Sequence, residues 1–208
     1  MRTRSFLIPF AVAVLLLGMG ASAFAQGRAP TAADKATEAK PVPRPQPTRE
    51  QRLEQLFGLL KQAPSEQVAQ AVEARIEAMM LQSGSDTADL LIVRARSMID
   101  AKDYDLSLQL LDSLIEIAPD FTEAYAQRAT VHYLKKDLYA AIADLRVVVA
   151  REPRHFTALA GLGVILNDIG EKKNALEAFR RAVALHPHIK QIPELLKRLE
   201  IEVEGREI

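Results

Sequence analysis

Apolar residues recur along residues 88–189 at helical spacing, in three blocks that repeat with a fixed period. Three prolines near the block ends, Pro119, Pro153 and Pro187, lie 34 residues apart (153 − 119 and 187 − 153). Each block contains two apolar stripes with a short turn between them, which predicts two amphipathic helices. One such pair cannot bury its apolar face alone, so about three pairs must stack to form a continuous core.

Small and large residues occupy equivalent places in the three blocks. Places are counted from residues 88, 122 and 156, where the blocks begin. Small residues hold the eighth place (Ala95, Ala129 and Gly163) and the twentieth place (Ser107, Ala141 and Ala175). Large residues hold the fourth place (Leu91, Tyr125 and Leu159) and the twenty-fourth place (Leu111, Leu145 and Phe179). We expect the two helices of a block to cross closely at the small residues. A larger side chain there would overpack the contact, at a cost of roughly 1–3 kcal/mol.

The turns and ends of the helix pairs are marked by polar residues and prolines. The pairs are predicted at residues 87–101 and 104–117, 122–136 and 139–151, and 156–169 and 173–185. Lys102-Asp103, Lys136-Asp137 and Gly170-Glu171 mark the turns within the pairs, and Gly170 suits a left-handed helix end. Each block's proline ends the second helix, because proline lacks an N–H and disfavours helix in the residue before it.

This block resembles the tetratricopeptide repeat (TPR) family, whose pattern has the same period and the same small, aromatic and proline positions. The resemblance implies an all-α, right-handed α-solenoid of about three helix pairs, with repeats at residues 88–121, 122–155 and 156–189. It also implies a non-catalytic scaffold that binds a protein or peptide.

Residues 49–87 are predicted to form a helical hairpin that is not a repeat. Leu53, Leu56, Phe57 and Leu60 share one face of the first helix, and Val68, Val72, Ile76, Met79 and Met80 share one face of the second. Pro64-Ser65 separates the two helices. The 34-residue register places Lys61 where a small residue belongs, so we expect the hairpin to close the open face of the first repeat as a cap.

Residues 190–208 are expected to form a C-terminal capping helix and a short acidic tail. Ile192, Leu195, Leu196 and Leu199 make one apolar stripe, and Pro193 lies in the first turn, where proline is tolerated. We expect this helix to cover the last repeat and to turn its polar face to water.

Residues 1–25 have the pattern of a secretory signal peptide. Arg2 and Arg4 precede an apolar run at 6–17, and Ala23-Phe24-Ala25 forms a small-x-small cleavage site. The run of about 12 residues is shorter than the roughly 20 that cross a bilayer. We therefore expect export to the periplasm. The alternatives are secretion, or anchoring in the membrane by an uncleaved signal.

Residues 26–48 are predicted to be a proline-rich, disordered linker. Pro41, Pro43, Pro45 and Pro47 alternate with other residues, which favours an extended, semi-rigid spacer. Binding of this segment to a small proline-recognition domain is the alternative.

Composition narrows the classes of function. The formal net charge is zero, so no overall field favours nucleic acid or anionic lipid. Cysteine is absent, which excludes disulfides, thiolate metal sites and thiol catalysis. The chain has no tryptophan, which argues against base-stacking surfaces.

No enzyme motif is present, and we expect no catalytic residue, cofactor, metal or small-molecule substrate. Nucleophile elbows, glycine-rich phosphate loops and HExxH helices are all missing. His186-Pro187-His188 could offer two imidazoles to a metal, but a site needs three or four converging ligands. We expect both histidines to be solvated in a turn, and we expect His132 to be a packed ring.

Two arginines take a place that is usually apolar in the family. Arg94 and Arg128 hold the seventh place of the first and second repeats, where the third has Leu162. Their stems could lie along apolar surface with the charged heads in water. A buried ion pair between repeats is the alternative.

The resemblance also implies a concave groove for an extended peptide or a partner helix. Carried over by register, the groove residues are Ile92, Arg96, Ile99, Ala126, Thr130, Tyr133, Ala160, Val164 and Asn167. The places of the carboxylate clamp in chaperone-tail-binding TPR domains hold Ile92, Arg96, Gln127, Thr157 and Gly161, so only Arg96 supplies a positive charge. An ordinary solvated helix face is the alternative.

The function predicted from these features is an exported scaffold that binds a protein or peptide in the cell envelope. Two alternatives stay open. The chain could be a structural protein that self-associates through an exposed end or the N-terminal hairpin, or an accessory subunit of an envelope enzyme complex.

Overall fold

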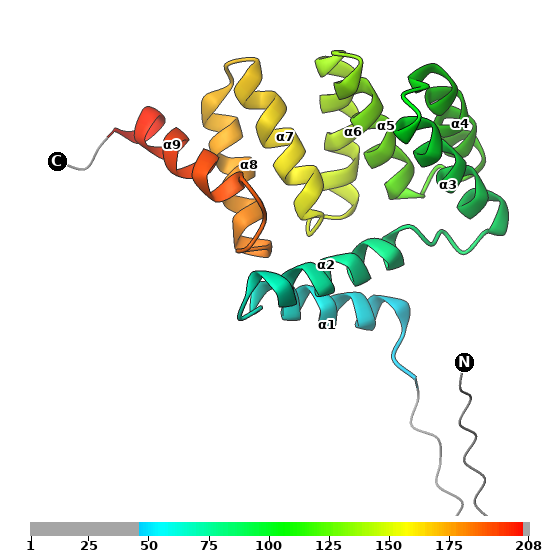
Figure 1. Cartoon of the computed structure of the whole chain (residues 1–208), viewed down its shortest axis with the longest axis horizontal. Coiled ribbons are helices and arrows are strands. Elements are labelled where there is room, and N and C mark those ends of the chain that lie inside the picture. The colour runs from blue at the N-terminus through cyan, green and yellow to red at the C-terminus, as the bar shows by residue number, and fades with distance from the viewer. Residues whose placement is uncertain (1–45, 206–208) are drawn as a thin grey trace, which may run out of the picture. The chain divides into compact units, whose positions relative to one another are not determined.

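The computed structural model describes residues 46–205, and within this range the chain forms nine α-helices and no strand (Figure 1). The predicted signal peptide and nearly all of the predicted linker lie outside the described residues. The helices are α1 (Arg49–Lys61), α2 (Glu66–Met80), α3 (Asp86–Asp100), α4 (Tyr104–Ile117), α5 (Thr122–Leu134), α6 (Leu138–Arg151), α7 (Phe156–Asp168), α8 (Lys172–Leu185) and α9 (Ile192–Glu204). Within 46–205, every helix is too short or too polar to cross a membrane.

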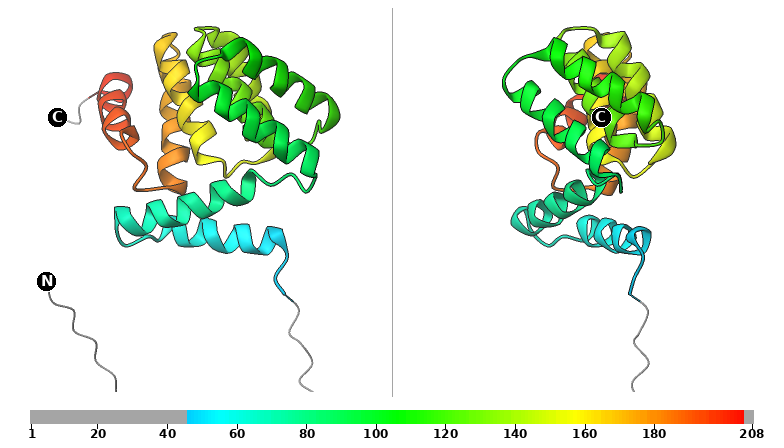
Figure 2. Two further views of the ribbon diagram at one scale, coloured as in Figure 1. Left: turned by 45° about the vertical axis from the view of Figure 1, so that its right-hand side comes forward. Right: turned by 90° about the vertical axis from the view of Figure 1, so that its right-hand side faces the viewer.

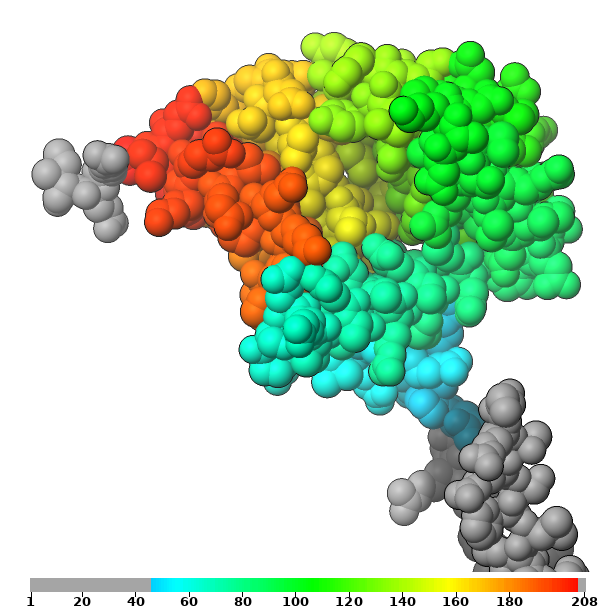
Figure 3. Space-filling view, in the orientation of Figure 1, coloured from blue at the N-terminus to red at the C-terminus, as the bar shows by residue number. Residues whose placement is uncertain are grey.

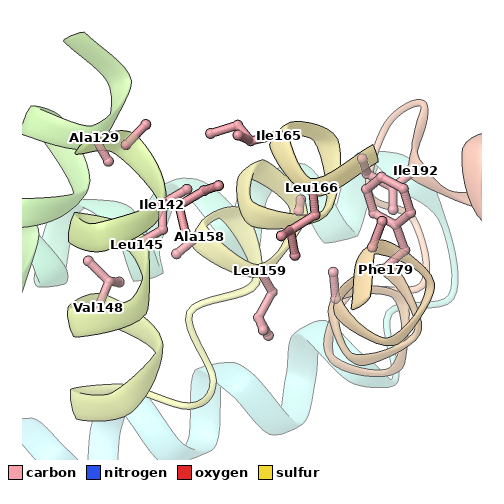
Figure 4. Close-up of a cluster of buried hydrophobic side chains, with 14 of the residues drawn as sticks. Ala129, Ile142, Leu145, Val148, Ala158, Leu159, Ile165, Leu166, Phe179 and Ile192 are labelled. Carbon is pink, nitrogen blue, oxygen red and sulfur yellow. The ribbon is translucent and has the colours of Figure 1, made fainter. Parts of the chain in front are cut away.

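Three helix pairs stand side by side in chain order and form an α-solenoid, as the period predicted (Figure 1). The pairs are α3 with α4, α5 with α6, and α7 with α8. Each second helix also packs against the first helix of the next pair. Side chains from neighbouring pairs meet in a common core, part of which Figure 4 shows around Leu145, Leu159 and Phe179.

The small residues lie where the two helices of a pair cross closely. All six eighth-place and twentieth-place residues are buried. In the first pair, the Ser107 hydroxyl of α4 donates a hydrogen bond of 3.0 Å to the Ala95 carbonyl of α3. A side chain can reach a helical backbone carbonyl in this way only where two helices approach closely, so the predicted crossing is confirmed.

The turn inside each of the three pairs contains one residue with a left-handed backbone conformation. Lys102, Lys136 and Gly170 have φ values of 62°, 66° and 85°. The amide after each one donates to a carbonyl five residues back, at 2.8–2.9 Å, which is the hydrogen bond that closes a Schellman helix end. In the first two turns, Asp103 and Asp137 then cap the second helix through their carboxylates.

The last helix covers the end of the stack, as the sequence predicted. Ile192 and Leu199 of α9 are buried in the same core as Phe179 of α8. On the outside, the Arg180 guanidinium binds Glu200 and Glu204 of α9. These contacts attach α9 firmly to the third repeat.

The N-terminal hairpin, α1 with α2, forms as predicted but does not cap the first repeat. It lies across the ends of the repeat helices (Figures 1 and 2), and its core of Leu53, Phe57, Leu60 and Ile76 packs against Phe156 at the start of α7. The prediction of an N-terminal cap on the first repeat was therefore wrong. The hairpin has Lys61 at the place of a small residue, so it lacks the close crossing that lets a pair extend the stack.

Two histidines that we expected to be solvated hold the hairpin in place. His186 is only 1% exposed, and its ring meets the ring of Phe156 edge-on at 5.1 Å. Its Nε2 atom lies 3.4 Å from a carboxylate oxygen of Glu73 on α2. His188 Nε2 donates to the Ala63 carbonyl at 2.9 Å. The solvated reading of this pair was wrong, because the hairpin packs over their turn.

Arg154 adds a further contact between the hairpin and the third repeat. Its guanidinium lies 4.7 Å from the centre of the Phe57 ring, within reach of a cation–π interaction. The same group forms ion pairs with Glu54 of α1 and with Glu152. Arg154 thus links α1 of the hairpin to the segment that precedes α7.

Candidate functional site

A cavity of about 390 Å³ lies between the hairpin and the first helices of the repeats. Figure 3 shows the face of the molecule on which the hairpin meets the repeats. Side chains of α2, α3, α5 and α7 line the cavity, so it lies at the concave side predicted from the register. The hairpin closes one end of the groove; we call this space the groove cavity.

Five of the nine predicted groove residues line the groove cavity: Arg96, Ala126, Thr130, Tyr133 and Val164. Gln127, Thr157 and Gly161, which hold places of the carboxylate clamp, line it as well. The family register therefore located the faces of α5 and α7 that line this cavity.

The other four predicted residues do not line the groove cavity. Ile92 is fully buried in the core of the first repeat, so its prediction as a contact residue was wrong. Ala160 is buried in the core that the second and third repeats share. Ile99 packs at the edge of the first core, and Asn167 lies in the last turn of α7.

The wall formed by α2 was not predicted. Glu77, Met80 and Leu81 close the groove cavity from this side. The register could not identify them, since we expected the hairpin at the end of the stack. Their only signal was that Met80 lies on the apolar stripe of a hairpin that had to pack somewhere.

His155 organises the polar part of the groove cavity and was also missed. Its Nδ1 accepts hydrogen bonds from the Ala158 amide at 3.2 Å and from the Thr157 hydroxyl at 3.0 Å, and thereby caps α7. The remaining ring nitrogen, Nε2, therefore carries the hydrogen. It donates to Glu123 of α5 at 3.3 Å.

Glu123 is held in a fixed orientation by two neighbours. Besides His155, the Gln127 side-chain amide donates to its carboxylate at 2.8 Å. The side chain of Glu123 is almost fully buried. This carboxylate is thus a fixed negative charge in the wall of the groove cavity.

Two opposite charges line the groove cavity without making a hydrogen bond or ion pair to any described residue: Glu77 of α2 and Arg96 of α3. Partial burial raises the pKa of Glu77 above its usual range, and repulsion by Glu73 and Glu123 raises it further. Arg96 and His155 oppose this shift only in part. Glu77 thus holds its proton more tightly than an ordinary glutamate, and a cation beside it would favour its charged form.

The arrangement is suited to non-covalent recognition. Thr130, Tyr133 and Gln127 present polar groups, while Met80, Val164 and Ile165 present apolar surface. Within residues 46–205, no three His, Cys, Asp or Glu side chains come together as a metal site would require.

The Arg128 guanidinium of α5 does not line the groove cavity and joins three helices. It forms ion pairs at 2.7 Å with Asp112 of α4 and with the buried Asp144 of α6. It also lies 5.6 Å from the centre of the Tyr125 ring. The pair with Asp112 joins two repeats but is exposed on the Asp112 side, and the buried pair with Asp144 lies within the second repeat. Arg128 therefore combines an inter-repeat pair with a buried one, whereas Arg94 is exposed.

Comparison with known proteins agrees with the geometry. The family model described as "Tetratricopeptide repeat" matches residues 128–188. A TPR repeat-containing protein of Rhizobium etli is 32% identical over 155 residues, which are 74% of this chain and 76% of that protein. A small glutamine-rich tetratricopeptide repeat-containing protein of Saccharomyces cerevisiae is 26% identical over 55% of this chain, and the match spans 33% of that protein.

Solved TPR structures share the fold. The first TPR domain of Spaghetti (RPAP3), bound to the HSP90 peptide SRMEEVD, has a TM-score of 0.55 at 17% identity and covers 58% of this chain and 95% of its own. MamA has a TM-score of 0.55 at 15% identity over 76% of this chain and 81% of its own. Given its 34-residue period, its stacked helix pairs and its relative in Rhizobium etli, the chain belongs to the tetratricopeptide repeat family.

Proposed function

We propose that the chain is a non-catalytic scaffold that binds an extended segment of a partner protein in the groove cavity. The observation that carries this proposal is a cavity lined jointly by α2, α3, α5 and α7, with polar groups spread among apolar ones. Such a surface can hold a peptide through side-chain pockets and hydrogen bonds. The peptide-bound RPAP3 domain supports this use of the fold.

The charge of the groove cavity favours a segment with a basic side chain next to an apolar one. Two carboxylates, Glu77 of α2 and Glu123 of α5, line the cavity with one arginine, Arg96 of α3. A lysine or arginine of the partner would offset the repulsion that Glu77 experiences. An acidic peptide such as the one bound to RPAP3 would instead approach two carboxylates.

The groove is tested with peptides selected on the protein itself. A randomised peptide display library would be enriched on the purified protein, and a selected peptide would be labelled for fluorescence anisotropy. We expect Tyr133→Ala and Glu77→Lys each to weaken binding about tenfold or more, because both side chains line the cavity. Asn167→Ala is the matched control, since Asn167 lies on α7 outside the cavity.

Equal affinity of the wild type, Tyr133→Ala and Glu77→Lys would remove the groove assignment. A library enriched in acidic rather than basic peptides would remove the charge argument and leave the groove in place. The two parts of the proposal therefore fail separately.

We further propose that the protein works in the cell envelope after export. Support comes from the charged start, apolar run and small-x-small site of residues 1–25. Residues 1–48 would be fused to alkaline phosphatase, a reporter that is active only where its disulfides form. We expect activity in the fusion and none when Val14→Arg and Leu16→Arg interrupt the apolar run. An inactive wild-type fusion would contradict export without affecting the groove.

A further inference from the structure

Glu123 of α5 is a nearly buried carboxylate whose two hydrogen-bond donors are neutral groups. Its side chain is 11% exposed. The donors are the Gln127 amide at 2.8 Å and the His155 ring at 3.3 Å. The ring is neutral in this arrangement, because His155 Nδ1 accepts the hydrogen of the Ala158 amide. Among the described residues, no lysine or arginine pairs with Glu123. Since buried charges in proteins are usually paired, a ligand can supply the cation.

Both oxygen atoms of this carboxylate keep an acceptor position. Gln127 donates to Oε1 and His155 to Oε2, and each carboxylate oxygen has two lone pairs. One lone pair on each oxygen is therefore unused by the described residues. The two donors fix the orientation of the carboxylate, and its place in the first turn of α5 stabilises its charge in the free protein. Glu123 thus offers two neighbouring acceptors to a group with two parallel N–H bonds.

The groove cavity supplies apolar surface and a second carboxylate around Glu123. Ala126 and Val164 line the same cavity, so the apolar stem of a long side chain can pack there. Glu77 of α2 lies near enough to feel Glu123: partial burial is the main cause of its raised pKa, and repulsion by Glu123 adds to it. A cation bound at Glu123 would therefore also attract Glu77.

We propose that the groove cavity recognises an arginine of the partner, whose guanidinium donates two parallel hydrogen bonds to the two oxygens of Glu123. The inference rests on the proposed function, because it names the residue that the bound segment must carry. A lysine is a poorer ligand for two reasons. Its ammonium is a point charge, whereas the planar guanidinium matches both oxygens at once. The ammonium is also more strongly hydrated, so it loses more on entering a nearly buried site.

The wild-type protein tests the proposal with variants of one peptide selected on it. We expect the library to enrich an arginine at one position. That arginine would be replaced by lysine, or by citrulline, which keeps the shape but lacks the charge. Fluorescence anisotropy should show affinities at least about tenfold lower for both replacements. A library without an enriched arginine, or equal affinities of the arginine and lysine peptides, would overturn the proposal.

Substitution of Glu123 assigns the arginine to its partner. Glu123→Gln removes the charge and keeps the shape, so it should weaken the arginine peptide about tenfold or more and leave the citrulline peptide nearly unchanged. Glu116→Gln is the matched control, since Glu116 is exposed on α4 and does not line the cavity. Circular dichroism melting shows that both variants are folded. Equal losses for the arginine and citrulline peptides would contradict a charge pair at Glu123.

Glu77→Gln distinguishes the paired carboxylate from its neighbour. Glu77 acts on the bound cation only through its charge, so this substitution should weaken the arginine and lysine peptides by the same factor. A variant that instead abolishes the preference for arginine, while Glu123→Gln keeps it, would assign the pair to Glu77 and overturn the proposal.

Failure of this inference can be told apart from failure of the groove itself. Selected peptides that need Tyr133 but no arginine would leave the groove in place and remove the role of Glu123. Selected peptides that bind equally well to the wild type, to Tyr133→Ala and to Glu123→Gln would remove both.

Discussion

Gly163 of α7 lies directly against the ring of Phe179 on α8. A Cβ atom at position 163 would come within 2.5 Å of two atoms of this ring. Phe179 is 1% exposed and surrounded by core residues, so the ring cannot move away freely. The eighth place of the third repeat therefore requires glycine, where the first two repeats accept alanine.

Gly163→Ala should destabilise the protein by roughly 1–3 kcal/mol through overpacking. The measurement is urea unfolding followed by circular dichroism. Gly161→Ala is the matched control in the same helix, since its Cβ would meet only Leu145 at an ordinary 3.7 Å. That variant should gain about 0.5–1 kcal/mol, because alanine favours helix over glycine. Equal effects of the two substitutions would contradict the close crossing.

Lys102→Gly and Lys136→Gly should each raise the free energy of unfolding by about 1 kcal/mol. Both lysines have positive φ, a conformation that glycine adopts without steric strain. The third turn already has Gly170 at the equivalent place, and Gly170→Ala should lower stability by about 1 kcal/mol. Thermal melts of the three variants check this. A destabilising Lys102→Gly would show that the lysine side chain makes a stabilising contact.

Arg128→Ala should cost about 3 kcal/mol, because it leaves the buried Asp144 carboxylate without its cation. Arg94→Ala, the same change one repeat earlier, should alter stability by no more than about 0.5 kcal/mol, because Arg94 is exposed. Denaturant unfolding of both variants measures the difference. Similar losses would mean that Arg128 contributes only the packing of its stem.

Acidification should loosen the contact between the hairpin and the third repeat through His186. Burial lowers the pKa of His186 from its usual value of 6.5, and the nearby Glu73 carboxylate opposes this only in part, while His188 adds to it. Below about pH 6.5, the unfolded chain therefore binds a proton that the folded chain excludes. The free energy of unfolding should fall as the pH drops from 6.5 towards the folded pKa.

Urea unfolding at pH 7.5 and pH 5.5 measures this effect in the wild type and in His186→Leu. The variant cannot titrate at this position, so its stability should depend less on pH. His132→Leu serves as a control for histidine removal elsewhere, because the His132 side chain is partly exposed. An equal pH dependence of wild type and His186→Leu would assign the effect to other groups.

The solenoid could be predicted from the sequence because its contacts are local and periodic. Ala95 and Ser107, the two small residues of the first crossing, lie on consecutive helices joined by a short turn. Equivalent small residues recur every 34 residues. The register of the family also placed Thr130, Tyr133 and Val164 on the faces of α5 and α7 that line the groove cavity.

The hairpin's position could not be predicted in this way. It depends on contacts that occur once in the chain, such as those of Phe57 with Arg154 and of Glu73 with His186, and no repetition in the sequence signals them. The role of His186 was missed for the same reason, because its turn becomes buried only when the hairpin packs over it. Ile92 shows the limit of the register itself, since one place can be buried in one repeat and line the groove in the next.

The hairpin's contacts also give the chain a property that a simple repeat array lacks. Glu54 and Arg154 are 100 residues apart, Glu73 and His186 are 113 apart, and Ala63 and His188 are 125 apart. In an ordinary array each repeat touches only its neighbours, so the end repeats can fray independently. Here the hairpin at the beginning of the domain contacts the third repeat, so we expect the hairpin and the three repeats to unfold as one cooperative unit. The entropy of closing so long a loop should make folding slow relative to a three-repeat array without the hairpin.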